Sequence, residues 1–194
     1  MNGKEIGSFS GTDLVISEGI SNQVINLQAS GSGSLYYFWE MEGIPVNMVG
    51  KQEDSYLKVR KTFYDRFGHE VTGKAFLQND LIVVKLSLQA LDFNASVENV
   101  AVADILPAGL EIENPRIGAI PELAWIKDAS GYDYLDVRDD RITFFTTATG
   151  TSKNYYYVVR AVSKGLFNMG PVSADAMYNG EYHSYWGAGT VMVK

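Results

Sequence analysis

Residues 81–88 read LIVVKLSL, a continuous apolar run that changes into an alternation of apolar and polar side chains. A period of two residues is typical of a β-strand, because successive side chains of a strand point to opposite faces. The apolar first half predicts a strand that is covered on both faces and lies centrally in a sheet. Residues 56–64 read YLKVRKTFY, and this half-polar pattern predicts a strand with one solvated face.

Short segments of the same kind recur along the chain, separated by Gly, Asn, Asp and Pro at intervals of about ten residues. Helical periodicity is nearly absent, so the predicted fold class is all-β, an antiparallel β-sandwich. The aromatic runs at residues 36–39 and 155–157 are attributed to core and inter-domain packing, with a carbohydrate-binding platform as the alternative. Strands are expected at residues 4–9, 13–17, 23–28, 34–40, 56–64, 81–91, 100–105, 141–147, 153–163, 173–178 and 190–193.

The 194 residues include 46% hydrophobic and 20% charged side chains, which is the composition of a folded globular chain. Sixteen Lys and Arg residues against 23 Asp and Glu residues give a formal net charge of −7, so no nucleic-acid partner is expected. The sequence has no cysteine, which excludes a thiolate nucleophile and a Cys-based zinc site within it. No apolar run reaches the roughly 18 residues of a membrane span, so this chain is expected to make no membrane contact.

A boundary between two parts of the chain is expected within residues 44–55, which read IPVNMVGKQEDS and combine Pro, Gly and several charges. The first ~45 residues supply only about four predicted strands, which is marginal for an independent domain and typical of half a sandwich. Residues 55–194 supply about seven or more, the number in a complete sandwich. Asn2-Gly3 is a hairpin signal that needs a preceding strand, which predicts that the chain is a piece of a longer polypeptide.

The titratable side chains do not predict catalysis, and no catalytic residue, cofactor or metal is assigned. His69 follows a tight turn and is expected to be solvated. Ser184 beside His183 invites a hydrolase interpretation, but adjacent residues of a strand point to opposite faces and do not pair as nucleophile and base. The acidic segment Asp133–Asp140 is expected to be a solvated hairpin loop, with calcium binding as the alternative.

The best candidate site lies at residues 178–187, which read YNGEYHSYWG. Large aromatic side chains among glycines are typical of a loop that contacts a partner. Tyr178, Tyr182, Tyr185 and Trp186 are therefore candidate contact residues.

Five segments then occur in a specific order: GSLYYFW at 33–39 followed by GIP at 43–45, LKVRKTFYD at 57–65, VADILPAGLEIENP at 102–115, YYVVRAV at 156–162 and PVSADAMY at 171–178. Together they resemble the C-terminal end of bacterial alpha-2-macroglobulins, large cell-envelope proteins that entrap proteases. The resemblance implies that residues 52–194 are the final macroglobulin-like β-sandwich. It also implies that residues 1–50 are the trailing half of a CUB-type domain.

In function, the resemblance implies a non-catalytic structural and interaction domain of a protease-trapping protein, which meets proteases through the parent protein. The expected location is the bacterial cell envelope, periplasmic or surface-exposed, with a lipid anchor on the parent protein left open. Met177-Tyr178 match a pair that shields the thioester in members that carry one, because an apolar Met and a large Tyr exclude water.

The expected partners are therefore the thioester and CUB-type domains of the same parent protein. The residues implied for this contact are Met177, Tyr178, Tyr182, Tyr185 and Trp186. For Met177 and Tyr178 the alternative is ordinary strand packing. For the chain as a whole the alternative is an independent Ig-like adhesion or carbohydrate-binding module.

Overall fold

A computed structural model describes residues 8–16, 26, 28, 30–34, 36–38, 40, 50, 52–113 and 123–194. The chain divides into two compact units, residues 1–44 and residues 45–194. In the first unit the described residues form no strand, and the side chains of Tyr36, Tyr37 and Phe38 are exposed. The hairpin expected at Asn2-Gly3 and most of the strand expected at 23–28 lie outside the described residues. The division into domains at 1–50 and 52–194 stays a prediction.

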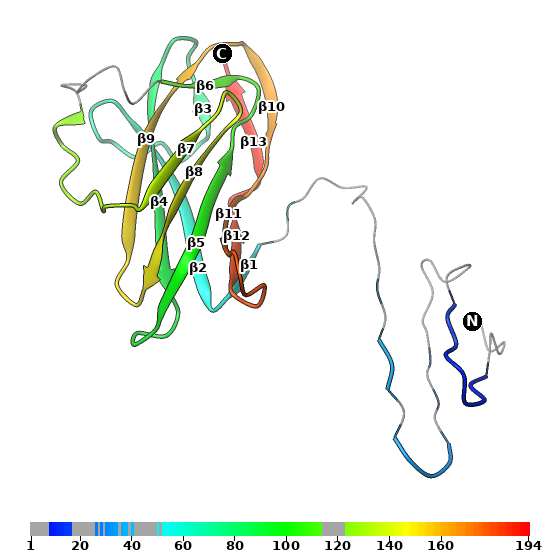
Figure 1. The fold of residues 1–194 in the computed structure, drawn as a ribbon. Helices are drawn as coiled ribbons and strands as arrows, with labels where there is room; N and C mark the ends of the chain where they lie inside the picture. The colour runs from blue at the N-terminus through cyan, green and yellow to red at the C-terminus, as the bar shows by residue number, and fades with distance from the viewer. Residues whose placement is uncertain are drawn as a thin grey trace. The chain divides into compact units, whose positions relative to one another are not determined.

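The described part of the second unit is built from strands arranged in three sheets (Figure 1). The six-stranded sheet has the order β1-β12-β11-β5-β8-β7, the four-stranded sheet β2-β4-β9-β6, and the three-stranded sheet β10-β13-β3. The strands are β1 (Glu53–Ser55), β2 (Leu57–Asp65), β3 (Ala75–Phe76), β4 (Leu81–Ala90), β5 (Ser96–Ile105), β6 (Leu110–Ile112), β7 (Tyr134–Val137), β8 (Arg141–Thr149), β9 (Lys153–Ala161), β10 (Gly165–Met169), β11 (Val172–Ala176), β12 (His183–Trp186) and β13 (Gly189–Val193).

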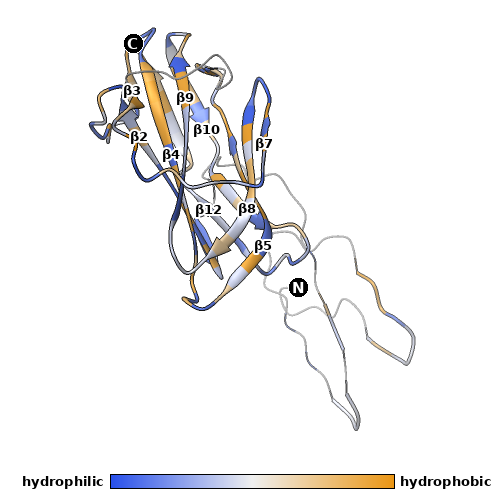
Figure 2. Cartoon of the chain, turned by 60° about the vertical axis from the view of Figure 1, so that its left-hand side comes forward, coloured by the Kyte–Doolittle hydropathy of each residue, from blue (hydrophilic) through white to orange (hydrophobic). Residues whose placement is uncertain are grey.

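The six-stranded and four-stranded sheets pack face to face around one core, which confirms the predicted antiparallel sandwich. Strand β4 lies between β2 and β9, and its first half is predominantly apolar in Figure 2. Ile82, Val83 and Val84 are all buried, so the first half of this central strand is covered on both faces, as its sequence predicts. Strand β2 alternates buried side chains with exposed or half-buried ones, which confirms its solvated face.

Aromatic side chains join the two large sheets. Tyr155 of β9 stacks on Phe144 of β8 with 5.0 Å between the ring centroids, and its hydroxyl donates to Thr146 Oγ1 at 2.8 Å. Tyr155 and Tyr157 are both buried in the core cluster. Core packing is therefore the role of these two tyrosines in the aromatic run at 155–157.

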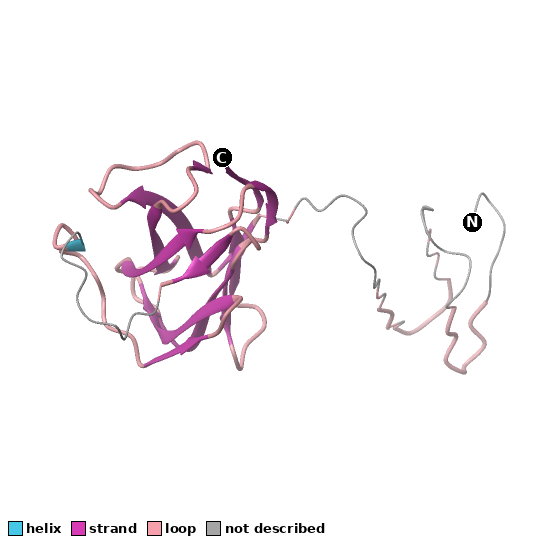
Figure 3. Cartoon of the chain, turned by 90° about the horizontal axis from the view of Figure 1, so that it is seen from above, coloured by secondary structure: helices cyan, strands magenta, loops and turns pink. Residues whose placement is uncertain are grey.

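The described part of the second unit consists almost entirely of strands and loops (Figure 3), and several of its strands differ from the expectations of the sequence. Tyr134–Val137 form β7 inside the acidic segment, so the expectation of a simple loop at Asp133–Asp140 is wrong. His183–Trp186 form β12, so the loop expected at 178–187 is partly a strand. Both are short segments of four residues: β7 pairs with β8, the next strand in the sequence, and β12 pairs with β11 just before it and with the distant β1.

Candidate functional site

A turn between β11 and β12 presents the Met-Tyr pair to solvent. We call residues 177–182 the aromatic turn. Tyr178 is 85% exposed and Met177 is 48% exposed, whereas Ala174 and Ala176 just before them are buried. Two backbone bonds shape the turn, from the Asn179 N–H to the Ala176 carbonyl at 3.2 Å and from the Tyr182 N–H to the Asn179 carbonyl at 3.1 Å. Met177 and Tyr178 therefore do not pack as buried strand residues.

A β-bulge in the neighbouring strand supports the start of this turn. The register between β5 and β8 shifts between Val97 and Val100, and Asn99 at the bulge has a φ of 56°. Its carbonyl accepts the Met177 N–H at 3.0 Å. Asn is one of the few residue types that adopts this left-handed conformation readily, so the bulge aims a carbonyl at the turn at low cost.

The end of the turn rests on an aromatic pair. Tyr182 stacks on Tyr56 with 4.7 Å between ring centroids and 27° between ring planes. Tyr56 has a φ of 57°, which is strained for a bulky side chain, and its carbonyl accepts the Leu91 N–H at 2.9 Å. Tyr56 is absent from the predicted site, because only the fold brings residue 56 to residue 182. The available signal was an aromatic residue directly after the predicted domain boundary.

Tyr185 and Trp186 lie farther along β12 and make contacts within the domain. The Tyr185 hydroxyl donates to Asp175 Oδ1 at 2.6 Å, and this bond, together with burial, raises the pKa of Tyr185 to about 12. The guanidinium of Arg60 lies over the Trp186 ring at 5.6 Å. The structure thus gathers Met177, Tyr178 and Tyr182 in one turn and places Tyr185 and Trp186 on the adjoining strand.

A hollow of about 380 Å³ lies beside the aromatic turn. Its lining combines the start of β5 with the turn itself and includes Tyr178, Tyr182, Asn99 and Val97. Leu91 and Phe93, in the connection that leads into β5, are 54% and 79% exposed. The turn is therefore one part of an end of the sandwich at which apolar side chains remain in contact with solvent.

The neighbouring polar residues do not form a catalytic set. The Ser184 hydroxyl is buried and donates to Asp54 Oδ1 at 2.7 Å, while His183 Nδ1 lies 2.9 Å from the Gly180 carbonyl. The His183 and Ser184 side chains thus bond to different partners, as expected for adjacent residues of a strand. His69 is solvated, with its side chain 80% exposed beside Asp65. Among the residues that the structure describes, no group of three or more His, Asp or Glu side chains is placed to hold a metal.

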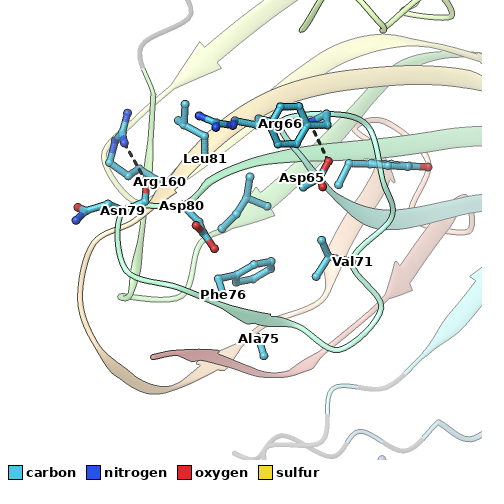
Figure 4. Close-up of a pocket in the computed structure, with 12 residues that line it drawn as sticks. Asp65, Arg66, Val71, Ala75, Phe76, Asn79, Asp80, Leu81 and Arg160 are labelled. Atoms are coloured by element: carbon cyan, nitrogen blue, oxygen red, sulfur yellow. Dashed lines mark hydrogen bonds between the residues drawn. The ribbon is translucent and has the colours of Figure 1, made fainter. Parts of the chain in front are cut away.

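A second hollow, of about 470 Å³, lies where β2 ends and β4 begins (Figure 4). Three of the charged side chains around it, Asp65, Asp80 and Arg160, bond to nearby backbone groups. Asp65 Oδ1 accepts the N–H groups of Phe67 and His69, Asp80 Oδ2 accepts the Leu77 N–H, and Arg160 Nη1 donates to the Asn79 carbonyl. Because these side chains already bond to the backbone, the first hollow, beside the aromatic turn, is the better candidate site.

The fold and the site together define a β-sandwich domain with an exposed aromatic turn at one end. The sequence profile described as "Bacterial Alpha-2-macroglobulin MG10 domain" matches residues 57–181. The chain therefore belongs to the bacterial alpha-2-macroglobulin family, and this matched region is its MG10 domain. In the described part of the chain, no helix is long and apolar enough to cross a membrane.

Relatives of known name agree with this assignment. The chain is 30% identical over 159 residues to an alpha-2-macroglobulin of Xylella fastidiosa strain Temecula1, covering 76% of this chain and 9% of the relative. It is 26% identical over 194 residues to an alpha-2-macroglobulin of Rickettsia conorii, covering 98% of this chain and 10% of the relative. The chain thus spans about a tenth of the length of the relatives it matches.

Solved structures share the fold. The native conformation of Escherichia coli alpha-2-macroglobulin matches with a TM-score of 0.66 at 22% identity, over 78% of this chain and 10% of that one. The trypsin-activated form of the same protein matches with a TM-score of 0.64 at 23% identity, over 74% and 11%. A Salmonella alpha-2-macroglobulin reacted with methylamine matches with a TM-score of 0.61 at 22% identity, over 74% and 10%.

Proposed function

We propose that the chain is a non-catalytic docking domain of a bacterial alpha-2-macroglobulin-like protease trap in the cell envelope, periplasmic or surface-exposed. Its aromatic turn would pack against the thioester domain of the parent protein and shield the reactive bond where one is present. The observation that carries this proposal is the 85% exposure of Tyr178 on a turn that backbone bonds and ring stacking hold at both ends.

The chemistry of the turn favours docking. A large aromatic side chain that is exposed but held on a fixed backbone loses little conformational entropy when a partner covers it. Buried aromatic anchors of this kind contribute strongly to protein interfaces. Met177 adds a flexible apolar surface that adapts to a partner and excludes water.

The relatives supply the biological context. One solved relative is an alpha-2-macroglobulin activated by trypsin, and another is an alpha-2-macroglobulin reacted with methylamine, a small amine. By analogy, we infer that the parent of this chain meets proteases. The docked turn would then keep water and amines from a strained acyl bond until the trap is triggered.

Binding measurements test the proposal directly. The 194-residue chain is titrated against the remainder of its parent protein, expressed without these residues, and the dissociation constant is measured by calorimetry. Tyr178→Ala should weaken binding at least about tenfold, as expected for an aromatic anchor. Leu166→Ala serves as the matched control, because Leu166 is a 66% exposed apolar residue on β10.

Equal binding by the wild-type and Tyr178→Ala chains would refute the docking role. Where the parent carries a thioester, Met177→Ala and Tyr178→Ala in the full protein should also raise its rate of reaction with methylamine. An independent adhesion or carbohydrate-binding module predicts something different, a rise of several degrees in melting temperature with glycans or calcium. We expect no such rise.

A further inference from the structure

Strand β1 is a short edge strand that pairs with β12, the strand directly after the aromatic turn. It contains three residues and pairs with β12 in the register Glu53↔Tyr185, Asp54↔Ser184 and Ser55↔His183. Among the described residues it is also the first strand of the second unit, which begins at residue 45 in the sequence. A three-residue edge strand has few backbone bonds, so it belongs to the part of a fold that opens most easily.

Two carboxylates attach this strand: Glu53 Oε2 lies 3.9 Å from His183 Nε2, and Asp54 makes the shorter bonds. Asp54 Oδ1 accepts the Ser184 hydroxyl at 2.7 Å, and both carboxylate oxygens accept bonds from Arg60, at 2.9 and 2.7 Å. The Ser184 oxygen in turn accepts the buried Val59 N–H at 2.9 Å. The Asp54 side chain thus joins β1 to β12 and β2 at once, and its removal would leave the buried Ser184 hydroxyl without its acceptor.

Tyr56 links β1 to the aromatic turn. It follows β1 in the left-handed conformation, and its ring stacks on Tyr182. Tyr182 closes the aromatic turn, because its N–H bonds to Asn179 and its carbonyl accepts the Ala176 N–H at 2.9 Å. Tyr56 is held by β1 before it and by the Leu91 N–H, which its carbonyl accepts at 2.9 Å, so loss of β1 removes one of the two supports of the residue that stacks on Tyr182.

We propose that β1 is a detachable latch for the aromatic turn. While Asp54 holds β1 on β12, the Tyr56 ring fixes Tyr182 and the turn presents Tyr178 in one conformation. When β1 lifts off, the Tyr56 ring loses its support from that strand and the turn loosens. Detachment of β1 would therefore change the surface that docks. This regulatory step rests on the proposed function of the turn.

Hydrogen exchange of the 194-residue chain tests the latch without any docking partner. Backbone exchange is followed by mass spectrometry in peptides covering residues 176–187 and residues 141–161. Asp54→Ala should speed exchange of 176–187 at least about tenfold, while exchange in β8 and β9 changes less than about twofold. Asp54→Asn keeps an acceptor for Ser184 and should show a smaller increase. Tyr56→Ala should loosen the turn while β1 itself stays protected.

Asp128→Ala is the matched control. Asp128 likewise accepts bonds from a cation and a hydroxyl, Lys85 Nζ at 2.9 Å and the Tyr156 hydroxyl at 2.6 Å, but it lies on another part of the surface. This control should leave exchange of 176–187 unchanged. Unchanged exchange in Asp54→Ala would overturn the latch, and so would an equal increase in every strand, which indicates only global destabilisation.

The two proposals fail separately. If exchange confirms the latch but Tyr178→Ala binds normally, the docking function is wrong and the latch stands. If Tyr178→Ala abolishes binding but Asp54→Ala leaves the turn protected, the docking function stands and the latch is wrong.

Discussion

Lys61 and Asp104 face each other across the core of the sandwich, with 2.7 Å between Lys61 Nζ and Asp104 Oδ1. Lys61 belongs to β2 in the four-stranded sheet and Asp104 to β5 in the six-stranded sheet. The Tyr157 hydroxyl donates to the other carboxylate oxygen at 2.6 Å, and burial raises the pKa of Tyr157 well above its usual value. This ionic cluster ties the two sheets together at a position from which water is excluded.

Removing one member of this buried ion pair should lower the free energy of unfolding substantially. Lys61→Met leaves the Asp104 carboxylate buried without its cation, and we expect a loss of about 3–5 kcal/mol in the free energy of unfolding. Replacing all three members, as in Lys61→Met, Asp104→Leu and Tyr157→Phe together, should recover much of that loss. Urea denaturation measures both. A loss below about 1 kcal/mol in the single variant would contradict the buried ion pair.

The two tyrosines of the aromatic turn should differ in their effect on stability. Tyr178 is 85% exposed, so Tyr178→Ala should change the free energy of unfolding by less than about 0.5 kcal/mol. Tyr182 is stacked on Tyr56, so Tyr182→Ala should cost about 1–2 kcal/mol. Chemical denaturation of the two variants side by side checks the difference. Equal losses would mean that Tyr178 is packed in solution.

The hydrogen bonds of the Asp54 carboxylate should make the free energy of unfolding depend on pH in the acid range. Hydrogen bonding from Arg60 lowers the pKa of Asp54 below its ordinary value, so the folded state binds this proton less tightly than the unfolded state. The resulting stabilisation is present above the unfolded pKa and is lost as the pH falls through the folded pKa. Between about pH 5 and pH 2, Asp54→Asn should lose less stability than the wild-type chain. Parallel curves for the two proteins would contradict this linkage.

The left-handed conformation of Asn99 predicts how substitutions at this position rank in stability. Its φ of 56° suits Gly and is unfavourable for β-branched residues. Asn99→Gly should therefore stay within about 0.5 kcal/mol of the wild type, while Asn99→Val should lose about 1–2 kcal/mol. Thermal unfolding followed by circular dichroism compares the stabilities of the two variants with that of the wild type. A more stable Val variant would show that the bulge carbonyl is not held in this conformation.

The predicted division of the chain is testable by deletion. If residues 52–194 form a complete sandwich, a chain without residues 1–50 should remain soluble and unfold cooperatively. The described core supports this expectation, because the buried residues of the hydrophobic cluster all lie between Leu57 and Val193. Aggregation of the shortened chain, or a broad and non-cooperative unfolding transition, would show the division to be wrong.

The fold class, the long strands and the resemblance to the family could all be predicted from local patterns in the sequence. Residues 57–65, 81–90, 141–149 and 153–161 form strands close to their predicted bounds, because an alternating pattern of eight or nine residues specifies both the strand and its buried face. The Met-Tyr pair is also recognisable in the sequence. Each of these features can be interpreted without knowledge of what it pairs with.

Which distant residues meet became known only from the folded chain. Tyr56 reaches Tyr182, and the Val59 N–H reaches Ser184, 125 residues away in the sequence. Strands β7 and β12, of four residues each, escape prediction because their own patterns are too short, and β12 also depends on pairing with the distant β1. The contacts that hold the aromatic turn, from Tyr56 and Asn99, likewise join residues that are far apart in the sequence. Register between strands depends on the packing of the whole core, and no single segment of the sequence contains that information.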